Sequence, residues 1–93
     1  MTDLPGGDLV AQGLADLARD DETVPALLVA VGAPRLRRLG YAVPAAPPGA
    51  ELRLYALLAR EHADAAHGRY NALVRRLVSF ERAAEALGAP AAP

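Results

Sequence analysis

The residues best suited to acid–base or metal chemistry lie in one short stretch around the chain's two histidines, His62 and His67. Asp64 lies between them, and the three side chains could converge as metal ligands if a new helix begins at Asp64. This spacing is unusual for a metal site, so two surface histidines are expected and no metal or other cofactor is predicted. The chain has no cysteine, which excludes a disulfide framework, a thiolate metal site and a thiol nucleophile.

Two other patterns bear on catalysis. Arg60 and His67 are separated by six residues, a spacing that resembles the arginine-to-histidine motif of HEPN-type ribonucleases. These ribonucleases are all-helical and hold the motif in a cleft between two protomers. Ser79 is the only serine and lies mid-helix, without the sharp turn or nearby base that a nucleophilic serine needs. We therefore predict no enzyme activity, and an HEPN-like ribonuclease using Arg60 and His67 remains an alternative.

The elements that position these residues are predicted to be helices. The 93 residues include 22 alanines and 15 leucines but only 4% aromatic residues. Alanine and leucine favour helices, and the β-branched residues that favour strands are scarce. A chain of this length forms one domain. The expected fold class is all-α, a small helical bundle of about five helices with a long C-terminal helix.

The single domain, residues 1–93, divides into five segments. Three prolines between Tyr41 and Ala50 exclude a helix there and predict an extended, polyproline-like linker. The segments are a flexible N-terminus (1–7), an acidic three-helix front (8–40), the Pro-rich linker (41–50), a helical hairpin with a long last helix (51–88) and a tail (89–93).

Capping residues predict where the helices begin and end. We expect Asp8 to cap a helix over residues 9–20 that leaves Asp16 exposed. Thr23 is expected to cap a helix over residues 24–31, which is apolar on every side and therefore buried. The remaining helices are expected over residues 35–39, 51–61 and 65–87, the last with a cap at Asp64 and with Gly88 in the left-handed conformation after its end.

The net charge of −1 hides an asymmetry between the two halves of the chain. Residues 1–34 carry six acidic residues and one arginine, whereas residues 35–93 carry nine arginines and five acidic residues. The halves could bind each other, within or between protomers, or the basic half could face an acidic partner. The absence of lysine and the overall acidic balance disfavour nucleic acid. A small DNA-binding regulator using residues 34–40 and 69–82 is a further alternative.

The start of the chain and its apolar runs bear on location. Residues 1–7 have neither a basic start nor an apolar run, so no signal peptide is expected. The longest apolar run, residues 24–33, is interrupted by Pro25 and Gly32 and is too short to span a bilayer. A cytoplasmic protein without membrane association is therefore expected.

The last helix carries the most regular pattern in the chain. Its apolar residues recur at alternating spacings of four and three over three heptads, as in helices that pack lengthwise against another helix. This seam is either the core of the domain or a ligand for another protein. A chain of this size supports only a small core, which favours a partner, identical or not. The seam consists of Ala66, Tyr70, Leu73, Leu77, Phe80, Ala84 and Leu87.

The stretch from Ala66 to Arg82, in the last third of the chain, resembles small helical proteins of GC-rich actinobacteria. Some of these are antitoxin partners of AbiEii-type nucleotidyltransferase toxins. The resemblance implies a non-enzymatic protein that neutralises a cognate toxin by binding it. We expect the long helix to insert apolar seam residues into a groove while arginines meet acidic residues, such as the toxin's metal-binding carboxylates. The predicted partner-binding residues are Arg69, Tyr70, Leu73, Arg75, Arg76, Leu77 and Phe80.

Overall fold

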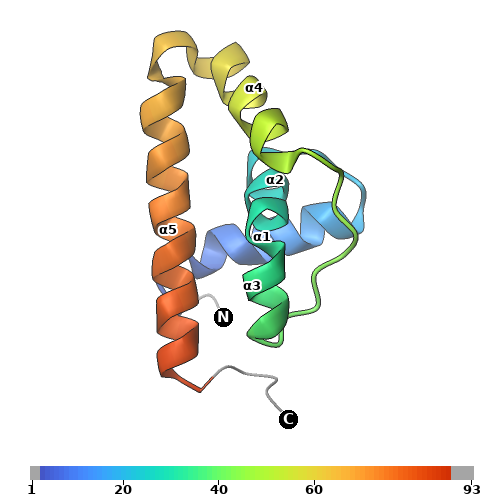
Figure 1. Cartoon of the computed structure of the whole chain (residues 1–93), viewed down its shortest axis with the longest axis vertical. Helices are drawn as coiled ribbons and strands as arrows, with labels where there is room; N and C mark the ends of the chain where they lie inside the picture. Colours follow the sequence, from blue (N-terminus) through green and yellow to red (C-terminus); the bar gives the residue numbers. More distant parts are fainter. Residues whose placement is uncertain (1–2, 89–93) are drawn as a thin grey trace.

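Every regular element in the computed structural model, which describes residues 3–88, is a helix (Figure 1). The all-α prediction and the long last helix are confirmed. No loop separates the last three elements, so residues 50–86 form one bent helical run of 37 residues. Counted as one element, this run gives four helices in the described part instead of about five. The elements are α1 (Gly7–Ala18), α2 (Val24–Val31), α3 (Ala33–Arg38), α4 (Ala50–His62), the 3-10 turn η1 (Ala63–Ala65) and α5 (Ala66–Ala86).

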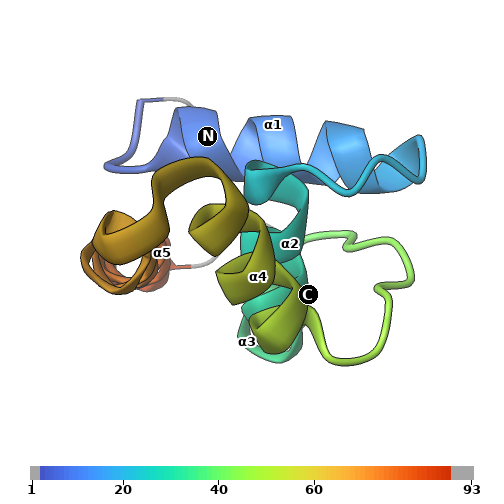
Figure 2. The same ribbon diagram turned by 90° about the horizontal axis from the view of Figure 1, so that it is seen from above.

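Helix α2 lies at the centre and contacts all four of the other α-helices. Helix α5 runs the length of the molecule, and α4 leads up to the turn from which α5 descends (Figure 1). Figure 2 shows α1 lying along one side of the bundle, across the other helices. All five α-helices contribute buried apolar side chains to one core cluster. None of the described helices combines the length and apolarity that a membrane span requires.

Helix α2 forms as its sequence predicts. The Thr23 hydroxyl accepts a hydrogen bond from the Ala26 amide at 3.2 Å, and Pro25 lies in the first turn, where no amide hydrogen is needed. Gly32 follows the last residue, and the five residues from Ala26 to Ala30 are buried. An all-round apolar helix is stable here because other helices cover it on every side.

The predicted caps at Asp8 and Asp64 are wrong. Helix α1 begins at Gly7, after Gly6 in the left-handed conformation (φ +72°), and it has no side-chain cap. A Cβ atom at Gly6 would lie 2.7 Å from the Arg76 carbonyl oxygen, so contact with α5 determines where α1 begins. Helix α5 likewise lacks a side-chain cap, and the turn before it has Ala63 at a positive φ of 47°. The left-handed Gly88 is confirmed. Helix α4 extends to His62, and the bend before α5 lies at Ala63–Ala65.

Residues 41–47 have no helix, as predicted, and they pack against the bundle. The Tyr41 and Phe80 rings have centroids 5.5 Å apart. The Arg37 guanidinium donates hydrogen bonds of 3.2 Å to the carbonyl oxygens of Val43 and Pro44. The linker is therefore held on the core by an aromatic contact and by an arginine of α3. The predicted tail, residues 89–93, lies outside the described residues.

Asp16 was expected outside the bundle, but its side chain is buried and joins α1 to α2. Its Oδ2 atom accepts a hydrogen bond from the Thr23 hydroxyl at 2.6 Å, and Oδ1 accepts from Gln12 Nε2 at 2.8 Å and from the Arg19 guanidinium. Thr23 thus binds Asp16 while it caps α2. The Thr23 and Gln12 hydrogen bonds, aided by Arg19, lower the pKa of Asp16 against the opposing effect of burial.

We expect Asp16→Asn to destabilise the protein at neutral pH and to change its acid sensitivity. The lowered pKa of Asp16 means that its ionised form stabilises the fold at pH values above the unfolded value of 3.8. This contribution is lost as the pH falls through the lower pKa of the folded state. Thermal unfolding from pH 7 to about pH 2 should show a steeper loss of Tm for the wild type than for the variant. Asp20→Asn, at an exposed position, is the control, and equal slopes for both variants would contradict this role.

Gly13 allows α1 and α2 to approach closely. A Cβ atom at Gly13 would lie 2.3 Å from the Pro25 carbonyl oxygen and 2.4 Å from Val29 Cγ2. Both distances are far below van der Waals contact, and the carbonyl belongs to the backbone of α2, which cannot rotate away. The helix crossing therefore requires a residue without a side chain at this position.

Gly13→Ala should lower the free energy of unfolding by about 1–3 kcal/mol, because the added methyl group forces the helices apart. Gly68→Ala is the matched control in α5, since a Cβ atom there meets nothing within 4 Å. The control should gain about 0.5–1 kcal/mol, the usual advantage of alanine over glycine within a helix. Chemical denaturation of both variants measures the difference, and a Gly13→Ala variant as stable as the wild type would exclude the close crossing.

Candidate protein-binding site

The seam predicted along α5 divides into a buried part and a partly exposed part. Leu77 and Phe80 are 4% and 0% exposed, and they lie in the protein's own core. The prediction that they enter a partner's groove is therefore corrected, because the rest of the chain already covers this half of the helix. Leu87, the last seam residue, is 74% exposed.

Tyr70 and Arg75 lie closer to the surface. Tyr70 is half-buried, and its ring lies against that of Tyr55 from α4, with centroids 5.8 Å apart. The Tyr55 ring is also 6.4 Å from the His67 ring, which makes a small aromatic group between α4 and α5. Arg75 is exposed, and within residues 3–88 no carboxylate lies within ion-pair distance of it.

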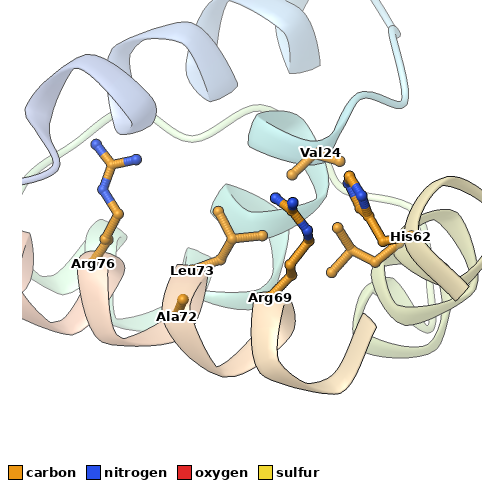
Figure 3. Close-up of a pocket in the computed structure, with 7 residues that line it drawn as sticks. Val24, His62, Arg69, Ala72, Leu73 and Arg76 are labelled. Atoms are coloured by element: carbon orange, nitrogen blue, oxygen red, sulfur yellow. The ribbon is translucent and has the colours of Figure 1, made fainter. Parts of the chain in front are cut away.

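The other three predicted residues, Arg69, Leu73 and Arg76, line a pocket between three helices. The pocket has a volume of about 270 Å³. Four of its residues recur along α5 at spacings of three, one and three, so they share one helix face. The end of α4 and the first residue of α2 form the other walls (Figure 3). The lining residues are Val24, Leu58, His62, Arg69, Ala72, Leu73 and Arg76.

The hollow follows from residue size along this face of α5. Arg69 and Arg76 are long, and Ala72 between them carries only a methyl group. Leu73 is more buried than Ala72 and points into the pocket beside Val24 (Figure 3), and Leu58 is a further apolar residue of the lining. The pocket thus combines an apolar interior with basic side chains at its edge.

The charged side chains among the lining residues are those of Arg69 and Arg76, both positive. These two arginines and His62 line the pocket, and no carboxylate does. Arg69 makes no ion pair within the described part of the chain, and its guanidinium extends toward Val24 and His62 (Figure 3). Arg76 Nη2 lies 3.3 Å from Asp8 Oδ1, and both side chains are at least half exposed, so this pair is weak. The site is therefore suited to an anionic group attached to an apolar body.

Four lining residues were missed by the sequence analysis: Val24, Leu58, His62 and Ala72. Val24 is expected in the buried helix over residues 24–31 and His62 on the surface, and neither Leu58 nor Ala72 belongs to the seam. The alignment of Arg69 with Arg76 was visible in the sequence, and the alanine between them is the signal that indicates a hollow. Nothing in the sequence showed which helices would complete it.

The residues considered for catalysis and metal binding lie on the surface or at the pocket. Arg60 and His67 are exposed, and the described contact of His67 on its own helix is with the Asn71 amide, 3.2 Å away. His62 faces the pocket, with Nε2 3.8 Å from a Glu61 carboxylate oxygen. Among residues 3–88, no three His, Cys, Asp or Glu side chains are grouped so that they could hold a metal ion.

Comparisons with protein-family models, curated proteins and solved structures found no match to this chain. The resemblance of residues 66–82 to antitoxins therefore stays a prediction. The chemistry of the pocket has to be argued from its own geometry and charge.

Glu81 is a buried carboxylate on the core side of α5. Its Oε1 atom lies 3.6 Å from Arg35 Nη1, while Arg35 Nη2 donates to Glu85 Oε2 at 3.4 Å. A Cβ atom at Gly32 would lie 3.3 Å from Glu81 Oε2, so the carboxylate lies directly on the junction of α2 and α3. Burial raises the pKa of Glu81, and the nearby Arg35 and Arg38 only partly oppose this.

We expect Glu81→Gln to remove a pH-dependent part of the stability. A raised pKa means that the protonated form favours folding, so the unfolding free energy of the wild type should increase as the pH falls from 7 towards the unfolded value of 4.5. The variant should lack this increase and be at least as stable as the wild type at pH 7. Glu85→Gln, which removes the exposed carboxylate on the same arginine, is the control. A large loss of stability in Glu81→Gln at pH 7 would show that the Arg35 pair outweighs burial.

Proposed function

We propose that this protein is a non-enzymatic protein-binding module, an antitoxin that neutralises a cognate toxin by direct binding through the pocket on α5. The observation that supports this most is the apolar pocket with Arg69, Arg76 and His62 at its edge and no carboxylate among its lining residues. Such a surface attracts an acidic partner and excludes a basic one.

The side chains at the pocket suit a protein interface. Arginine binds a carboxylate with two parallel hydrogen bonds, which fixes orientation as well as charge. Arg69 needs no rearrangement for this, since no described carboxylate competes for it. Leu73 beside it is half-buried and supplies the apolar contact that surrounds strong interface residues.

A toxin with an acidic active site could be neutralised in this way. In a nucleotidyltransferase, metal-binding carboxylates would accept hydrogen bonds from Arg69 and Arg76, and the arginines would compete with the metal and the nucleotide for the site. The part of α5 that carries the antitoxin resemblance, residues 66–82, includes both arginines. Leu77 and Phe80, in contrast, act from within the fold and hold this helix in place.

The test is co-expression with the product of the adjacent toxin reading frame. The wild type should co-purify with the toxin and restore growth. The double variant Arg69→Glu, Arg76→Glu should weaken binding at least about tenfold, equivalent to about 1.4 kcal/mol, because it reverses the charge at the edge of the pocket. Arg82→Glu reverses the charge of one exposed arginine of α5 outside the pocket; it is the control for charge reversal on this helix and should keep both properties.

Other outcomes would assign a different function. A wild-type protein that stays a monomer by mass measurement and captures no toxin would exclude the antitoxin proposal. A salt-dependent shift of operator DNA by the protein alone would indicate a DNA-binding regulator. RNA cleavage that is lost in His67→Ala would indicate an HEPN-like ribonuclease.

A further inference from the structure

We infer that the pocket recognises a helix of the partner protein that carries two acidic residues two turns apart, with one large apolar residue between them. This inference rests on the proposed function and adds the form of the segment that binds. It follows from the spacing of the two arginines, from the size of the hollow and from the geometry of peptide segments.

The spacing comes from α5. Arg69 and Arg76 are seven residues apart on one helix face, which separates them by two turns, or about 10.5 Å along the axis. Ala72 and Leu73 lie between them on this face, and both line the pocket. A ligand that uses both arginines must therefore present two anionic groups at about this separation, with an apolar group at its middle.

A helix meets this requirement and an extended segment does not. In a helix, residues i and i+7 point to the same side and are about 10.5 Å apart, with i+3 and i+4 between them. In a strand, residues that share a side are separated by multiples of about 6.6 Å, so neighbours on that side fall at about 6.6 or 13 Å. A helix also places its middle residue above Ala72, which has the smallest side chain among the lining residues.

The size of the pocket supports a single inserted side chain. Its volume of about 270 Å³ is below the range of about 300–1,000 Å³ that is usual for small-molecule and cofactor sites. It has room for one leucine, methionine or phenylalanine side chain from a helix that lies on the surface. Val24, Leu58 and Leu73 would contact this side chain.

Asp8 shows where one of the partner's acidic groups would lie. It belongs to the first turn of α1, its side chain is 76% exposed, and its Oδ1 atom is 3.3 Å from Arg76 Nη2. A partner carboxylate at Arg76 has to displace it. Removal of the Asp8 charge should therefore strengthen binding, whereas a residue needed only for the fold would not behave in this way.

Binding of synthetic peptides to the full chain tests the inference. Two labelled peptides of about 18 residues, long enough to be helical with an alanine-rich background, have the same composition. The matched peptide has glutamates at i and i+7 and one leucine at i+4, between them on the same face. The permuted peptide has the same glutamates on opposite faces of the helix. Fluorescence anisotropy measures the Kd of each, and circular dichroism checks that both are equally helical.

The matched peptide should bind at least about tenfold more tightly than the permuted one. Arg69→Gln and Arg76→Gln should each weaken it several-fold, and Asp8→Asn should tighten it. Ala72→Leu, at an exposed position, should fill the hollow and abolish binding. Ala86→Leu, which is exposed on the same helix but outside the pocket, should bind like the wild type.

Equal affinity for the two peptides, or unchanged binding by Ala72→Leu, would overturn the inference. Toxin capture that depends on Arg69 and Arg76 would still support the proposed function in that case. Selective binding of the matched peptide without any toxin capture would instead support the helix-binding pocket and exclude the antitoxin role. The two failures are therefore distinguishable.

Discussion

The close crossing of α1 and α2 is the contact on which the rest of the structure depends. Gly13 leaves space for the carbonyl group of Pro25, and Asp16 binds Thr23 just where α2 begins. Because α2 touches every other α-helix, its position fixes theirs. A hydrogen bond between two short polar side chains thus orients a helix that has no polar residue of its own to do so.

The candidate site forms where α2, α4 and α5 pack together. Leu77 and Phe80 of α5 are buried in the core. The neighbouring face of α5 therefore lies beside the start of α2 and the end of α4, where the pocket forms. Arg69 and Arg76 lie on that face because seven residues make two turns. Within residues 3–88, the ion pairs between the acidic and basic halves are the surface pairs of Asp8 with Arg76 and of Glu22 with Arg53, so most of the arginine charge of α5 stays accessible.

Local signals in the sequence predicted local structure well. Thr23, Pro25, Gly32 and Gly88 act within one helical turn, and all four behave as expected. Long-range contacts decided the rest. Asp16 is buried because the Thr23 hydroxyl, seven residues away, donates a hydrogen bond to its carboxylate. Gly6, and not Asp8, is the residue that precedes α1, because α5 passes close to it. A heptad seam shows that something covers a helix face, but it does not identify what covers it, so the seam alone could not separate core from interface.

Ala63 joins the two walls of the pocket, since α4 ends at His62 before it and Arg69 follows in the second turn of α5. Its positive φ is costly for an alanine, by about 1–3 kcal/mol, and glycine would adopt it freely. The bend is therefore maintained by the packing of α4 against α5 and not by local preference. Because residues of both α4 and α5 line the pocket, the angle between these two helices also sets the width of the pocket.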